Sequence, residues 1–128
     1  MEFHRGRLID HLHLRVADLT ASRRFYQAVF EALGLPDVIQ EGPGFFFADE
    51  LFVEAASDYI SRVHLAFQAS DREAVHAFYT AALAHGGRDH GPPGPRLYHP
   101  GYYAAFVLDP DGNNVEAVFH GPSRCRST

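Results

Sequence analysis

The sequence predicts an α+β fold in which one unit, a strand, a helix and three further strands, occurs twice in tandem. The first supporting observation is that the chain matches itself at an offset of 53 residues, which aligns His11 with His64 and Phe25-Tyr26 with Phe78-Tyr79. The second is that each copy opens with alternating apolar and polar residues, the pattern of a strand with one buried face. The third is that apolar residues then recur at helical spacing until a glycine ends the helix.

The first copy, which we call module one, is expected over residues 8–56. Its opening strand is predicted over residues 8–16, and Asp18 is a suitable N-cap for the helix that follows. Gly34 and Pro36 end that helix. Three short strand-like runs separated by turn residues complete the module, at residues 37–40, 44–48 and 51–55.

The second copy, module two, is expected over residues 62–120, and Ser70 or Asp71 is expected to cap its helix. A weak strand near Arg88 is followed by strands at 102–108 and 113–120. The tight turn Asp109-Pro110-Asp111-Gly112 joins the last two, because proline fixes one φ angle and glycine accepts a positive one. Residues 91–101 are rich in Gly and Pro and have no counterpart in module one, so they are expected to form an inserted loop.

Composition places the chain among small-molecule proteins. Its 128 residues suit a single domain, 1–128, with a polar tail at 121–128. The net charge of -5 and the absence of a basic run argue against a nucleic-acid partner. No apolar stretch approaches the roughly 20 residues of a membrane span, and the start lacks the apolar run of a secretory signal. Cys125 is the only cysteine, which excludes an intrachain disulfide. We expect a cytoplasmic protein.

The period-two patterns predict which residues face away from the helices. Leu12 and its alternating partners face the helix of module one, so His11 lies on the opposite side. The same reasoning places His64, Glu116 and Glu54 on that side, which we expect to be concave. Because a repeat does not need a polar residue at this position for packing, the coincidence of His11 with His64 points to function.

Two histidines and one or two carboxylates on one face suit a divalent metal. Neutral imidazole and carboxylate are ligands for zinc, nickel, manganese, cobalt or iron(II), with little selectivity among them. Three protein ligands leave positions open for substrate, as a catalytic site requires. His13 has Ala66 as its counterpart in module two, so it is expected to line the pocket.

Three segments resemble the vicinal oxygen chelate superfamily, which includes glyoxalases, bleomycin-resistance proteins and extradiol dioxygenases. They are residues 10–18, residues 22–26, and Asp109 to Glu116, a tight turn followed by a glutamate. The resemblance covers about residues 8–120 and implies two βαβββ modules that form a cup-shaped, incomplete barrel around a divalent metal. Position by position it implies His11, His64 and Glu116 as metal ligands.

In lactoylglutathione lyase-like members a glutamate of module one is a fourth ligand, and Glu54 is the residue that matches it. His11 to Glu54 spans 43 positions, whereas His64 to Glu116 spans 52, so the two modules differ in length.

The resemblance leaves three functions open. The first is a metal-dependent lyase or isomerase of the glyoxalase type, in which a glutamate moves a proton; a fourth ligand at Glu54 favours it. The second is an extradiol-type iron(II) dioxygenase or a thiol transferase, which the three ligands alone suit, although extradiol enzymes usually have four modules. The third is a non-catalytic drug- or small-molecule-binding protein of the bleomycin-resistance type, which would lack the ligand set found here.

The remaining expectations concern the pocket and the assembly. We expect Glu116, Glu54, His99 and Tyr102 to be catalytic, with His99 and a tyrosine reaching the pocket from the inserted loop. The residues expected to contact the small-molecule substrate are His13, Arg15, Phe47, Phe52 and Tyr103. The resemblance also implies a homodimer, since these cups often pair and sometimes share sites.

Overall fold

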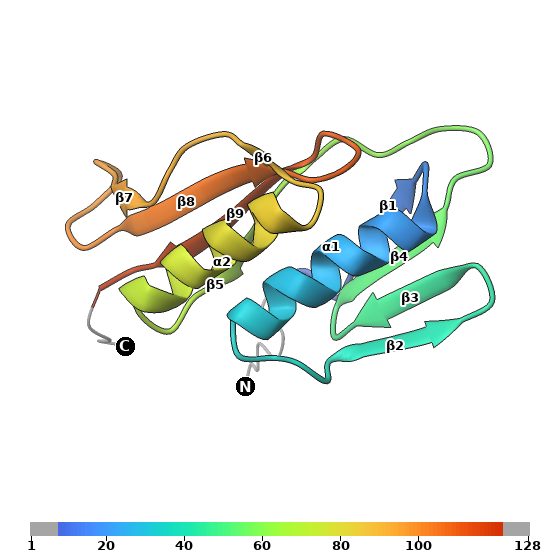
Figure 1. The fold of residues 1–128 in the computed structure, drawn as a ribbon, viewed down its shortest axis with the longest axis horizontal. Coiled ribbons are helices and arrows are strands. Elements are labelled where there is room, and N and C mark those ends of the chain that lie inside the picture. Colours follow the sequence, from blue (N-terminus) through green and yellow to red (C-terminus); the bar gives the residue numbers. More distant parts are fainter. Residues whose placement is uncertain (1–7, 122–128) are drawn as a thin grey trace.

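Two open β-sheets lie side by side and both helices cover the same side of them (Figure 1). The structure is a computed structural model that describes residues 8–121, so Cys125 and most of the predicted tail lie outside it. No helix within that range is long and apolar enough to cross a membrane. The predicted α+β class is therefore confirmed, with two separate sheets that do not close into a barrel.

Module one forms the first sheet in the order β1-β4-β3-β2, with helix α1 (Leu19–Ala32) packed against it. Strand β1 pairs in parallel with β4, and the other neighbours are antiparallel. The strands are β1 (Leu12–Val16), β2 (Ile39–Gly42), β3 (Phe45–Ala48) and β4 (Leu51–Ala55).

Module two repeats this arrangement in the order β5-β9-β8-β6, covered by α2 (Arg72–Ala84). Strand β5 pairs in parallel with β9, as β1 does with β4. The strands are β5 (His64–Gln68), β6 (Arg88–Asp89), β7 (Gly94–Pro95), β8 (Tyr103–Leu108) and β9 (Asn114–Phe119). The short strand β7 comes from the predicted loop and adds to β8, which sequence patterning did not predict.

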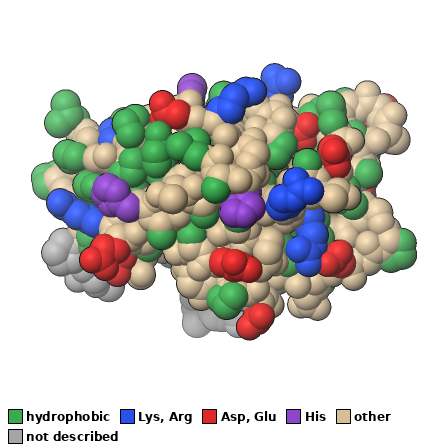
Figure 2. All heavy atoms as spheres, in the orientation of Figure 1, with side chains coloured by type: hydrophobic (Ala, Val, Ile, Leu, Met, Phe, Trp, Pro, Cys, Tyr) green, Lys and Arg blue, Asp and Glu red, His purple; other side chains and the backbone are tan. Residues whose placement is uncertain are grey.

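The core lies between the helices and the sheets. Phe67 of β5 packs edge-to-face against Phe30 of α1, with ring centroids 5.2 Å apart, so α1 contacts both sheets. Both predicted helix caps are present: Asp18 accepts a hydrogen bond from Ala21 N, and Asp71 accepts one from Ala74 N. On the helix side of the molecule, acidic and basic side chains are interspersed (Figure 2).

The opening strand is shorter than predicted. Pairing between β1 and β4 starts where Leu12 N donates to Glu50 O at 2.8 Å, and Leu12 lies opposite Leu51. Because β4 offers no partner before that point, His11 lies one residue before the strand instead of inside it.

Candidate metal site on the helix-free face

The first part of the candidate site is a glutamate held between a histidine and a tyrosine. His64 of β5 and Glu116 of β9 meet on the face of the second sheet that the helices leave uncovered, with His64 Nε2 2.8 Å from Glu116 Oε1. The second carboxylate oxygen accepts a hydrogen bond from the Tyr102 hydroxyl. Glu116 is 2% exposed, so its charge is stabilised by these two partners instead of by water.

The register of the sheet explains why these residues meet. His64 lies opposite Asn114 and Ala66 lies opposite Glu116, so the histidine and the glutamate are diagonal neighbours on one face. This register is fixed by the turn that follows β8. Its buried Asn113 accepts a hydrogen bond from Val63 N at 2.7 Å, directly before His64.

The same turn is tied to α1. Asp109 accepts hydrogen bonds from Asp111 N and Asn113 N, both at 2.9 Å, and from the Tyr26 hydroxyl at 2.5 Å. Gly112 completes the turn at φ +89°, a conformation that favours glycine. The Asp-Pro-Asp-Gly-Asn segment therefore acts through structure: it sets the position of His64 relative to Glu116.

Burial and the neighbouring Glu116 carboxylate raise the pKa of Tyr102 to about 12. Tyr102 therefore stays protonated near neutral pH, and its hydroxyl donates a hydrogen bond to the Glu116 carboxylate. The Phe106 ring lies beside His64, with centroids 6.0 Å apart, and gives this part of the site an apolar wall.

A buried acceptor adjoins this cluster. Within residues 8–121, Asn114 Oδ1 has no hydrogen-bond partner although the atom is buried. Asn114 lies opposite His64 and two residues before Glu116, on the same face. An unpaired acceptor beside an imidazole and a carboxylate suits a ligand or water that those groups hold.

The spacing of His64 and Glu116 is compatible with two ligands of one divalent metal. Two atoms bound to one ion at about 2.1 Å and at right angles are about 3 Å apart. The 2.8 Å between His64 Nε2 and Glu116 Oε1 is close to that separation. Imidazole and carboxylate are also the donors that such ions take in enzymes.

The second part of the candidate site is a hollow of about 520 Å³ on the helix-free face of module one. Its residues include several that the sequence predicted for the site: His11, His13, Phe47, Phe52 and Glu54. Side-chain Nδ1 of the exposed His11 lies 2.9 Å from Asp10 Oδ1. The predicted fourth residue, Glu54, lies 3.3 Å from Arg15 and 3.5 Å from His13.

Comparison of the two registers shows which residue of module one corresponds to Glu116. Glu116 lies opposite Ala66, two residues after His64. The residue two positions after His11 is His13, and its partner in β4 is Phe52. Phe52 therefore occupies the position equivalent to Glu116, and Glu54 lies two residues further along the strand, opposite Arg15.

Across residues 8–121, no group of three or more His, Cys, Asp or Glu side chains is arranged to hold a metal ion. The structure thus brings His64 and Glu116 together and leaves His11 in the hollow of module one, apart from them.

The family model described as the Glyoxalase/Bleomycin resistance protein/Dioxygenase superfamily matches residues 8–117. The chain belongs to this superfamily. A search among curated proteins found no match.

Three solved structures illustrate the similarity. A glyoxalase/bleomycin resistance protein from Albidiferax ferrireducens T118 is 28% identical, with a TM-score of 0.79 over 87% of this chain and 98% of that one. A glyoxalase I mutant, V278E, from Zea mays is 27% identical, with a TM-score of 0.57 over 86% of this chain and 45% of that one. Oxidase ChaP-H2 is 21% identical, with a TM-score of 0.60 over 88% and 92%.

One predicted contact residue of this superfamily member lies on the wrong face. Tyr103 is 9% exposed and packs under α2, where its hydroxyl lies 2.6 Å from His76 Nε2 and Arg72 stacks on its ring. Tyr102 and Tyr103 are consecutive in extended backbone, so only one of them can face the site. The expectation that Tyr103 contacts substrate is corrected: Tyr102 takes the site side. His76 is exposed on α2 and contacts Tyr103.

His99 lies at the margin of the cluster. Its ring stacks on His120 with centroids 5.1 Å apart and meets Tyr102 edge-on at 5.2 Å. His99 therefore contacts the ring of a site residue but does not line the hollow of module one.

Arg96 is the residue of the second module that sequence reasoning missed at this site. Alternation along β8 and β9 was sufficient to place Phe106 and Asn114 beside Tyr102 and Glu116. Arg96 had no such signal, because its strand β7 has only two residues.

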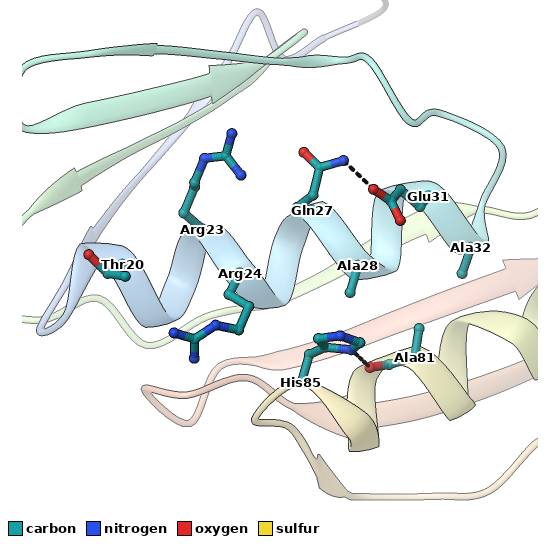
Figure 3. A pocket seen from close by; sticks show the side chains of 9 residues that line it. All are labelled: Thr20, Arg23, Arg24, Gln27, Ala28, Glu31, Ala32, Ala81 and His85. Carbon is teal, nitrogen blue, oxygen red and sulfur yellow. Dashed lines mark hydrogen bonds between the residues drawn. The ribbon is translucent and has the colours of Figure 1, made fainter.

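A larger groove, of about 660 Å³, lies on the opposite side of the protein, between α1 and α2 (Figure 3). Arg24 and Ala28 point toward α2, whereas Arg23 and Gln27 point away from it. Gln27 donates to Glu31 and Arg23 to Glu41, so these polar groups satisfy one another. The groove contains one glutamate and one histidine, but Glu31 accepts a hydrogen bond from Gln27 and His85 contacts Ala81 O.

Proposed function

We propose that this chain is a divalent-metal enzyme that binds a small substrate through two neighbouring oxygen atoms. The observation that carries the proposal is the His64–Glu116 pair. His64 Nε2 lies 2.8 Å from Glu116 Oε1, and the Tyr102 hydroxyl donates a hydrogen bond to the other carboxylate oxygen. Histidine and glutamate would supply two ligands, and Tyr102 would orient the carboxylate, as hydrogen-bonded outer groups do in metal sites.

His11 would be the third ligand, contributed by a second copy of the chain. Two observations support this. Side chains of residues 8–121 in one copy do not form a set of three ligands. In addition, β5 is an edge strand that is paired on one side only, and an open sheet edge can pair with another chain. A two-fold dimer would bring module one of each copy to module two of the other.

A metal ion bound there would act as a Lewis acid that polarises two adjacent substrate oxygens. The residues of the chain have separate roles. Phe106 beside His64 and Phe52 in module one form apolar walls that suit a flat substrate. Tyr102, whose pKa is raised to about 12, keeps its proton and holds the Glu116 carboxylate in one orientation.

The ligand count favours oxidative chemistry on a vicinal diol such as a catechol. Phe52 at the position equivalent to Glu116 leaves three ligands, and two histidines with one carboxylate leave room for both substrate and oxygen. The small size of the chain is compatible with this, since the oxidase ChaP-H2 is matched over 92% of its length.

Isomerisation or lysis of the glyoxalase type is the second candidate. The 27% identity to the maize glyoxalase I mutant favours it. In this case Glu54, beside His13 on the helix-free face, would move the proton without binding the metal.

The test is metal analysis of protein purified without a histidine tag, followed by turnover assays with catechols and with hemithioacetals. His64→Ala and His11→Ala are expected to lose the metal. His85→Ala is the matched control, because His85 lies in the helix groove and bonds to Ala81 O. Protein without bound metal, or with equal metal in all three variants, would overturn the enzyme proposal and favour a binding protein.

A further inference from the structure

The inserted loop carries an arginine into module two near the candidate metal site. β7 pairs with β8, and Arg96 N donates to Tyr102 O at 2.9 Å, which continues the pairing by one residue. Residues opposite each other in an antiparallel pair project to the same face. Arg96 therefore shares the helix-free face with Tyr102 and, further along β8, Phe106.

Backbone carbonyls of the inserted loop surround the Arg96 guanidinium group. Arg96 donates from one terminal nitrogen to Gly94 O at 2.9 Å and Pro95 O at 3.3 Å, and from the other to Pro92 O at 2.9 Å. A Cβ added at Gly91 or Gly94 would lie 3.3 Å from those nitrogens. The two glycines thus leave the space that the guanidinium occupies.

These contacts orient Arg96 without neutralising it. All three partners are backbone carbonyls, and no acidic group within residues 8–121 forms an ion pair with Arg96. The contrast is Arg15, the arginine on the same side of module one, which is paired with Glu54 at 3.3 Å. A half-buried, uncompensated guanidinium is a strong partner for an anion.

The position of the charge relative to the metal ligands indicates what the anion is. The Arg96 guanidinium carbon lies 5.2 Å from the Phe106 ring centroid, and the same ring lies 6.0 Å from the His64 ring. Because the guanidinium lies over the Phe106 ring, a flat molecule that reached from His64 to Arg96 would lie beside Phe106 and not on it.

We propose that Arg96 is the anchor for an acidic group, a carboxylate, on a flat substrate whose adjacent oxygens face His64 and Glu116. This inference rests on the proposed function for the diol end of the substrate only. The acid end depends on Arg96 and Phe106 alone, and it is tested without a metal.

The probe for the acid end is benzoate, with benzyl alcohol as its neutral analogue, added to metal-free protein. In ¹H–¹⁵N NMR titrations, benzoate is expected to shift the signals of the 91–101 loop saturably, whereas benzyl alcohol binds about tenfold more weakly or worse. Arg96→Gln is expected to abolish the preference for benzoate over benzyl alcohol. Arg96→Lys is expected to retain part of it, because lysine keeps the positive charge but cannot donate two parallel hydrogen bonds to a carboxylate.

Two control variants test whether the loss of any arginine weakens benzoate binding, or only the loss of Arg96. Arg72→Gln removes an arginine that stacks on Tyr103 on the opposite face of β8, and it should leave benzoate binding unchanged. Arg23→Gln, which removes an arginine that is paired with Glu41, should do the same. If wild-type protein shows no saturable benzoate shift, or if the preference for the acid persists in Arg96→Gln, the inference is wrong.

A parallel titration of metal-loaded protein compares 3,4-dihydroxybenzoate with catechol. Tighter binding of the acid, lost in Arg96→Gln while catechol binding stays, supports the inference. Equal loss of both ligands would mean that Arg96 only braces the loop. A protein that binds benzoate through Arg96 but takes up no metal would refute the proposed function and leave the anion site standing.

Discussion

A mixed dimer with one ligand removed from each copy tests whether the metal site is shared. His11 lies in module one, and His64 and Glu116 lie together in module two. If each site joins module one of one copy to module two of the other, pairing a His11→Ala chain with a His64→Ala chain creates one site with all its ligands and one site lacking both histidines.

The expected stoichiometry follows directly. Wild-type dimers would bind about two ions, either variant alone about none, and the isolated mixed dimer about one. Mixed dimers are obtained by co-expression with two different peptide tags, neither of them histidine, and purified over both tags in turn. Metal content per dimer is then measured by mass spectrometry.

A second pairing supplies the control. Combining His64→Ala with Glu116→Ala leaves both copies of module two defective, so the mixed dimer should remain empty whichever chain supplies His11. Metal-free His11→Ala/His64→Ala dimers would refute the sharing argument, provided that the wild-type dimer binds metal. Wild-type protein that binds metal as a monomer would refute it as well.

Three further predictions concern single residues. Phe52→Glu would place a carboxylate at the position equivalent to Glu116 and is expected to lower the Kd for the metal, whereas Glu54→Gln should change it little; chelator competition measures both. Tyr102→Phe removes the donor to Glu116 and should weaken metal binding about 10- to 100-fold with unchanged circular dichroism. Tyr26→Phe should cost about 1.5–3 kcal/mol in urea unfolding, because the hydroxyl donates to buried Asp109. Burial, and to a smaller extent the neighbouring Asp109, raises the pKa of Tyr26 above its usual value of 10.0. The stabilisation by this hydroxyl is therefore complete below pH 10 and falls as the pH rises further. Tyr26→Phe should show a smaller loss of stability across that range.

Patterning predicted most of the fold because both modules have one buried face per strand. Alternation placed His64 and Glu116 on the same side of the sheet, and the caps at Asp18 and Asp71 were visible from their position before an apolar helical run. Strand β7 was not predictable, since two residues, Gly94 and Pro95, carry no periodic signal.

The site was less predictable than the fold because alternation gives a face but not a position along the strand. Glu54 and Phe52 lie on the same face of β4, so both satisfied the pattern. Only the pairing of β1 with β4 shows that Phe52 stands opposite His13. Tyr103 was expected at the site because of its chemistry. Its neighbour Tyr102 faces the site, so alternation along the strand places Tyr103 on the opposite face.

The unequal use of the two modules follows from the same register. Module two contributes a histidine, a glutamate, a tyrosine donor and the loop arginine, all fixed by β8, β9 and the turn between them. In module one, Phe52 occupies the position equivalent to Glu116, and Glu54 is paired with Arg15. A metal centre drawn from both modules, as proposed, would therefore take one ligand from the first and two from the second, and the phenylalanine-lined side of module one would remain for the body of the substrate.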